Sequence, residues 1–185
     1  MSEHSQTGAE GGEGEMERFE TQILRELLPA EKDLMPPPAK QQARDKDAAG
    51  HLDHWSAAVL LERGAYLRKL AKYGDGQASE TLKEYPQHAT MLSFRARDGE
   101  AELHENFADV FYVLDGRATL VTGGAVIGMR TVGPGEIRGD RIEGGTRQEL
   151  RAGDVAHVPA GVPHQMLMTG DRTFTSFVVK IREQP

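Results

Sequence analysis

One stretch decides the fold: Gly153-Asp154-Val155-Ala156-His157-Val158-Pro159-Ala160-Gly161-Val162-Pro163-His164. Gly153 and Asp154 are typical of a turn, and 155–158 is apolar enough for a short strand that Pro159 and Gly161 would end. His164 then begins the next strand, directly after a rigid turn. A rigid hairpin holds a metal ligand or a catalytic base better than a flexible loop does. The stretch therefore marks His164 as a candidate site residue.

A second group of polar residues lies upstream, in the segment 102–116. Glu102 and His104 are two positions apart in a predicted strand, so their side chains point to the same face. Asp109 opens the strand that follows. Together with His164, four candidate ligands come from separate strand positions, and a small barrel would bring such positions together in its interior.

The hydrophobic pattern changes from helical spacing to alternation at about His88. Turn residues rich in Gly, Pro and Asp separate the short alternating segments, and Asp115-Gly116 is one of the predicted turns. The strands that we predict cover 88–97, 100–105, 109–115, 117–122, 125–130, 147–151, 155–158, 163–168 and 173–181. Regular short strands of this kind predict an all-β sandwich or barrel. The stretch 132–146 is the longest irregular piece and a candidate lid or rim loop.

The residues around His164 resemble the second sequence motif of the cupins. That motif places a glycine, a proline, a second glycine and a histidine at fixed spacing, and here these positions hold Gly153, Pro159, Gly161 and His164. Met168 stands where the family usually has asparagine.

The segment before it resembles the first cupin motif, with changes. His104 takes the place of the second histidine, Asp109 that of the glutamate, and Gly116 that of the closing glycine. Glu102 replaces the first histidine, and Ala96 replaces the opening glycine. The first motif is therefore altered at two positions.

The resemblance covers roughly 88–182. It implies a jelly-roll (cupin) barrel with a metal site in its interior, and often a homodimer. It is less specific for function than for fold, because this fold hosts many chemistries.

The resemblance also implies a ligand set. The predicted metal ligands are Glu102, His104, Asp109 and His164, with Glu102 and Asp109 as candidates for proton transfer where they do not bind metal. Two imidazoles with up to two carboxylates favour Fe²⁺ or Mn²⁺, with Zn²⁺ and Ni²⁺ as alternatives. Asp109 has a second interpretation as the hydrogen-bond partner of His104. The contrasting hypothesis is a hydrogen-bonded histidine pair without metal.

Other residues have simpler interpretations. Met166 and Met168 alternate with Gln165 and Leu167, so one of these two sets is expected to face inward with His164 and make that pocket apolar. The remaining histidines outside the motif positions are interpreted as packing or surface residues: His51, His54, His88 and His157.

Composition narrows the class of protein. The chain of 185 residues has a net charge of −7 and no basic stripe, so we expect no nucleic-acid partner. It has no cysteine, which excludes disulfides and thiolate ligands. Its apolar runs are too short to span a bilayer, and the N-terminus lacks the pattern of a signal peptide. These features predict a cytoplasmic protein with no membrane contact.

The predicted organisation has four parts. Residues 1–16 are polar and predict a disordered tail, and 17–50 predict a helix followed by a Pro-rich linker. Residues 51–87 predict an N-terminal helical segment packed on the barrel, with Asp53 or Ser56 as its N-cap. Residues 88–185 predict the barrel itself.

We therefore expect a small metal-dependent enzyme that acts on a small organic molecule, with dioxygenase-like oxidation as the leading reaction. The altered first motif and the missing asparagine leave a non-catalytic ligand-binding or sensing cupin as an alternative. A metal-dependent sugar isomerase or epimerase is a third hypothesis, because it would use the same site.

Overall fold

The computed structural model describes residues 52–183. The tail, the first helix and the linker predicted for 1–50 lie outside the described residues, as does His51. Among the described residues, no helix is both long and apolar enough to cross a membrane.

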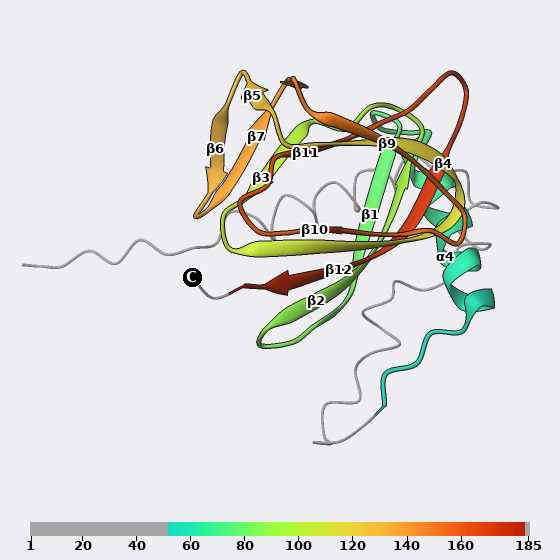
Figure 1. The fold of residues 1–185 in the computed structure, drawn as a ribbon. Helices are drawn as coiled ribbons and strands as arrows, with labels where there is room; N and C mark the ends of the chain where they lie inside the picture. Colours follow the sequence, from blue (N-terminus) through green and yellow to red (C-terminus); the bar gives the residue numbers. More distant parts are fainter. Residues whose placement is uncertain (1–51, 184–185) are drawn as a thin grey trace, which may run out of the picture. The chain divides into compact units, whose positions relative to one another are not determined.

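Helix α4 spans Ala57–Ala71 and precedes the sheet. Ser56 is its N-cap, because the Ser56 hydroxyl accepts a hydrogen bond of 3.3 Å from the Val59 amide. Arg68 and Lys69 lie in its last turn, where positive charge stabilises the helix end. The predicted helix and its Ser56 cap are confirmed, and the helix lies on one side of the barrel (Figure 1).

The rest of the described chain is built from short antiparallel strands. They are β1 (Gln77–Glu84), β2 (His88–Arg95), β3 (Ala101–His104), β4 (Phe107–Thr122), β5 (Ala125–Ile127), β6 (Arg130–Gly133), β7 (Glu136–Gly139), β8 (Arg141–Glu143), β9 (Thr146–Arg151), β10 (Val155–Val158), β11 (His164–Leu167) and β12 (Phe174–Arg182). The predicted all-β class is confirmed.

Strand β4 connects the two sheets of the barrel. Its first half lies between β12 and β10, in a sheet ordered β1-β2-β12-β4-β10. Its second half lies between β9 and β11, and β11 continues the second sheet through β3 and β7 to β6. The two sheets curl around each other as a jelly roll (Figure 1), which confirms the predicted barrel.

Gly116 corrects one prediction. We expected a turn at Asp115-Gly116, but β4 runs through both residues as one strand. Gly116 has φ +81° and pairs with Phe174 of β12, and the pairing shifts register two residues earlier, where Leu114 is left without a partner. A Cβ on Gly116 would lie 1.9 Å from the Thr173 carbonyl oxygen. The glycine therefore lets one long strand pass from one sheet into the other, with a bulge beside it at Leu114, instead of forming a turn that ends the strand.

Two further sequence predictions need correction. The polar segment 77–84 was not predicted as a strand, but it forms β1, whose one fully buried side chain is Leu82. The stretch 132–146 was predicted as an irregular lid or rim loop, but it contains β7 and β8 and the end of β6. Glycines at the turns concealed the short strands there, and β7 pairs with β3 through backbone hydrogen bonds.

Two apolar cores hold this arrangement together. One lies inside the barrel and consists of Val113, Ala118, Leu120, Leu150, Val158, Met166 and Phe174. The other lies between α4 and the outer face of β1 and β2, and consists of Leu60, Leu67, Ala71, Leu82, Leu92 and Phe94. Side chains along β2 alternate between the two faces of the sheet. Leu92 and Phe94 therefore pack against the helix, while Met91, Ser93 and Arg95 line an interior cavity.

Candidate metal centre

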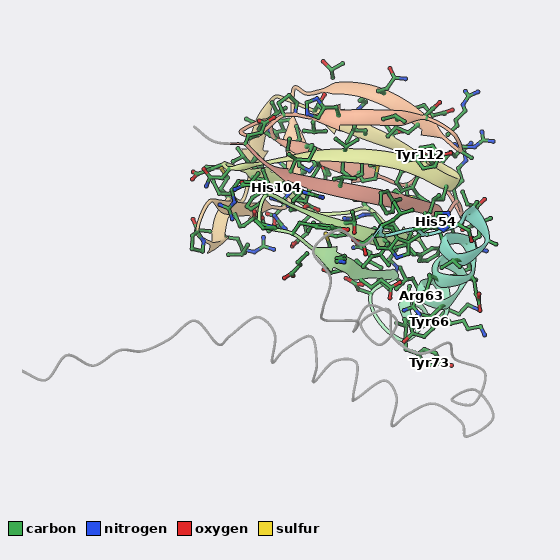
Figure 2. The ribbon with its side chains drawn as sticks, turned by 90° about the horizontal axis from the view of Figure 1, so that it is seen from below. His54, Arg63, Tyr66, Tyr73, His104 and Tyr112 are labelled. Carbon is green, nitrogen blue, oxygen red and sulfur yellow. The ribbon has the colours of Figure 1, made fainter. Side chains whose placement is uncertain are left out.

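The barrel brings together the four side chains that the sequence singled out. Glu102 and His104 come from β3, Asp109 from β4 and His164 from β11. Glu102 pairs directly with His164 across the two strands. His104 lies at the end of the barrel away from α4 (Figure 2). The predicted common face of Glu102 and His104 is confirmed by their position in one cluster.

The two histidines direct their Nε2 atoms toward the same carboxylate oxygen of Asp109. The Nε2 atom of His104 lies 3.4 Å from Glu102 Oε2 and 3.3 Å from Asp109 Oδ2. The Nε2 atom of His164 lies 3.4 Å from the same Asp109 oxygen. Ligand atoms of Glu102, His104 and His164 all lie within 4.8 Å of one another. Asp109 therefore contacts both imidazoles, while the mutual cluster is a Glu–His–His group.

Each histidine uses its other ring nitrogen for a hydrogen bond. His104 Nδ1 lies 2.5 Å from Glu136 Oε2, and His164 Nδ1 lies 3.2 Å from the Val162 carbonyl oxygen. Because both partners are acceptors, each Nδ1 carries the donated proton. In the neutral imidazole, Nε2 is then left with its lone pair.

Burial makes these lone pairs unusual. Both Nε2 atoms are buried without a hydrogen-bond partner, and so is Asp109 Oδ1. A buried polar atom without a partner is costly, and a metal ion is one of the few groups that would satisfy several at once. Bonds of ~2.1 Å to one metal place neighbouring ligand atoms roughly 3.0–3.4 Å apart, from octahedral to tetrahedral geometry. The observed spacing fits such an ion.

Positive side chains hold the carboxylates in place. Arg95 Nη2 lies 3.2 Å from Glu102 Oε1, and Arg138 Nη2 lies 3.4 Å from Glu102 Oε2. Lys180 Nζ lies 3.7 Å from Asp109 Oδ1. The Asp109 side chain is only 5% exposed, so this lysine offsets part of the cost of burying its charge. Each candidate carboxylate ligand thus has a cationic neighbour.

The pKa values of the cluster follow from these contacts. Burial raises the pKa of Glu102, but contact with His104 and the charges of Arg138 and Arg95 lower it to about 2. Burial also raises the pKa of Asp109, and its contacts with His104 and His164 bring the pKa well below its usual value. Both carboxylates are therefore ionised at neutral pH.

The imidazole of His104 responds to the same charges in the opposite sense. Burial lowers its pKa, but contacts with Asp109, Glu102 and Glu136 raise it to about 10. Without a metal ion, this imidazole would carry a second proton, and therefore a positive charge, near neutral pH. A divalent cation would have to displace that proton, because an imidazole binds metal in its neutral form.

A cavity of about 200 Å³ opens beside the cluster. Glu102, Asp109 and His164 form part of its wall. The Phe111 ring meets the His164 ring edge-on at 6.2 Å, and Met166 lines the cavity next to them. The predicted apolar contribution of Met166 is confirmed. Met168 instead packs against the barrel core.

Sequence reasoning missed four functional neighbours of the cluster. Glu136 and Arg138 were placed in a loop, and Arg95 and Lys180 were assigned to strands without a role. Two residues apart on a short strand, Glu136 and Arg138 repeat the spacing of Glu102 and His104 on β3. This spacing could have indicated a strand with two polar side chains on one face, but the flanking glycines favoured the prediction of a loop.

The other described histidines lie where they were predicted. His54 and His157 are exposed, and His88 stacks on Tyr85 with ring centroids 4.2 Å apart.

Comparison of sequences identifies no relative: no family model matches the chain, and no curated protein matches it. Solved structures that resemble it are consistently cupin or double-stranded β-helix proteins. One is TT1209 from Thermus thermophilus, with 19% identity over 64% of this chain and 95% of that chain and a TM-score of 0.44.

Two more show the range of activities named for such structures. A cupin-superfamily sugar phosphate isomerase from Silicibacter pomeroyi is 21% identical over 59% of this chain and 61% of that chain, with a TM-score of 0.43. The polyketide cyclase RemF from Streptomyces resistomycificus is 18% identical over 60% of this chain and 68% of that chain, with a TM-score of 0.42. Because these likenesses are distant, the strand order and the site geometry carry the conclusions below.

Proposed function

We propose that the protein is a divalent-metal-dependent enzyme that oxidises a small organic molecule in the barrel cavity, in the manner of a dioxygenase. One observation carries the proposal: two buried Nε2 atoms, His104 and His164, converge without a hydrogen-bond partner beside carboxylate oxygens. Two histidines and one carboxylate on one side of a metal form the ligand set of non-haem Fe²⁺ oxygenases. Glu102 would supply that carboxylate.

The residues around the ligands have distinct roles in this proposal. Glu136 holds the Nδ1 proton of His104 and keeps Nε2 available, and the Val162 carbonyl does the same for His164. Arg95 and Arg138 orient the Glu102 carboxylate. When bound, Fe²⁺ would supply electrons for the reduction of dioxygen, and Mn²⁺ is the alternative ion.

Elemental analysis of the purified protein tests the proposal. We expect about one Fe or Mn per chain in the wild type and a loss of most of it in both His104→Ala and His164→Ala. His157→Ala is the matched control, because that side chain is exposed and lies outside the cluster. A wild-type protein that binds no divalent metal, and whose melting temperature does not respond to Fe²⁺ or Mn²⁺, would refute the proposal.

A second candidate function is isomerisation or epimerisation without dioxygen. The buried Asp109 favours it, because Oδ1 has no hydrogen-bond partner and the residue lines the cavity. A carboxylate beside a bound substrate could move a proton between neighbouring carbon atoms. Oxygen-electrode measurements with a turned-over substrate separate the two reactions, since only the oxidation consumes dioxygen.

A further inference from the structure

Three cationic side chains from three strands face the cavity beside the candidate metal centre. Arg95 comes from β2, Arg138 from β7 and Lys180 from β12, and all three line the same space. Their side chains are 21%, 24% and 22% exposed, so each is largely withdrawn from solvent. Burying a positive charge costs free energy unless an anion lies close to it.

Three carboxylates near these cations determine the net charge of the site. Glu102, Asp109 and Glu136 are the negative neighbours of the three cations, so six side chains sum to zero when both imidazoles are neutral. A divalent cation would then give this group of side chains and metal a net charge of about +2. This step rests on the metal centre proposed above.

A row of hydroxyl groups lines the same cavity. Ser79 of β1 pairs with Ser93 of β2, and Ser93 pairs with Ser176 of β12. The three serines therefore stand side by side across three adjacent strands, and all three line the cavity. Hydroxyls in such a row can donate hydrogen bonds to the oxygen atoms of an acidic group.

The size of the cavity limits the ligand. A volume of about 200 Å³ corresponds to the space of roughly seven water molecules. A molecule with about ten or fewer non-hydrogen atoms fits this space, and a nucleotide does not. Met91, Phe111 and Val178 line the same cavity and would contact the carbon skeleton of such a molecule.

We infer that the substrate is a small dianion, with its negative charge on two carboxylates or on one phosphate group. Arg95, Arg138 and Lys180 together with the metal ion balance its charge, and the row formed by Ser79, Ser93 and Ser176 binds its oxygen atoms. Carboxylate and phosphate share the acceptor chemistry that guanidinium groups and hydroxyls recognise.

Binding to the Mn²⁺-loaded full-length protein tests this inference. The probes are succinate and glycerol 1-phosphate as dianions, with 1,4-butanediol and glycerol as neutral counterparts of similar size. At constant ionic strength, we expect the dianions alone to raise the melting temperature saturably. The stronger of the two identifies the acidic group. Metal content after desalting is measured in the same samples, and removal of Mn²⁺ by either acid counts against the inference.

Variants test the anion site, and Ser93→Ala separates it from the metal centre, because Arg95 also contacts Glu102. Arg95→Gln should weaken dianion binding roughly tenfold or more, and Ser93→Ala about two- to tenfold. Arg97→Gln is the matched control, because it removes one exposed positive charge near Arg95 and should leave binding unchanged. Ser93 comes from β2, which carries none of the candidate ligands, so its variant should keep the wild-type metal content.

The outcomes distinguish the two proposals. If the wild type retains Mn²⁺ but binds neutral and dianionic probes equally, or if Arg95→Gln and Arg97→Gln bind dianions equally, the substrate class is wrong and the metal centre stands. If the wild type retains no Mn²⁺, the proposed function fails, and the charge argument for the dianion fails with it.

Discussion

Glu136→Gln is the sharpest test of how the metal centre is organised. The Glu136 carboxylate lies 2.5 Å from His104 Nδ1 and 3.5 Å from Arg138 Nη1, and its side chain is 25% exposed. Glutamine keeps the shape of glutamate but removes its charge. The amide oxygen can still accept the hydrogen bond from Nδ1, but the imidazole loses the negative charge that raises its basicity as a ligand.

The expected effect is a loss of metal affinity. Removing a carboxylate that hydrogen-bonds to a ligand histidine lowers affinity about 10- to 100-fold, which corresponds to ~1.4–2.7 kcal/mol. The free energy of unfolding of the metal-free protein should change less, because Glu136 lies at a partly exposed edge of the site. Glu136→Ala should weaken binding at least as much as Glu136→Gln.

A competition titration with a fluorescent chelator measures the affinity for Mn²⁺ in each variant. Glu105→Gln is the control, because Glu105 is exposed and follows His104 directly in the chain. Nitrogen chemical shifts of the His104 ring, measured with diamagnetic Zn²⁺ bound, report its tautomer in parallel. Wild-type affinity in Glu136→Gln, or an unchanged tautomer in Glu136→Ala, would refute the role assigned to Glu136.

Three further predictions concern stability. Leu67→Ala should destabilise the protein by about 2–5 kcal/mol in urea unfolding, because Leu67 is 1% exposed under α4, whereas Leu61→Ala, at a side chain 49% exposed on the same helix, should cost much less. Gly116→Ala should cost more than Gly153→Ala: both glycines have positive φ, but only the first would place its Cβ against a backbone carbonyl. Burial and a hydrogen bond to a carboxylate raise the pKa of Tyr85 to about 12. Its contribution to stability should be complete below pH ~10 and be lost as the pH rises through about 12, which an absorbance titration of the tyrosines with parallel unfolding would detect.

The barrel could be predicted from the sequence because its signals are local. Alternating side chains and Gly-containing turns mark β2, β9, β10, β11 and β12 close to their observed bounds. Strand β1 was not predicted because its sequence is mostly polar, and α4 covers its outer face. The turn predicted at Gly116 was wrong because a glycine with positive φ can also lie within a strand, here two residues from a β-bulge.

The candidate ligands could be predicted as well, but their supporting residues could not. His104 and His164 belong to spaced patterns that are visible along the chain. Glu136, Arg95 and Lys180 become neighbours of the ligands only through strand pairing between distant segments. A single sequence does not reveal which register such strands adopt, and the polar partners of a site depend on that register.

The charges of the site also help to select that register. In the observed pairing of β3 with β7, Glu102 lies opposite Arg138 and His104 opposite Glu136. A slip of β7 by two residues in one direction would place Glu102 opposite Glu136. A slip in the other direction would place Glu102 opposite Asp140 and His104 opposite Arg138. Either slip sets like charges against each other, which destabilises a cross-strand pair, and a slip of one residue would turn the β7 side chains to the other face of the sheet. The glycines that flank β7 specify its register only weakly, so the residues that support the metal centre also align the strand that carries them.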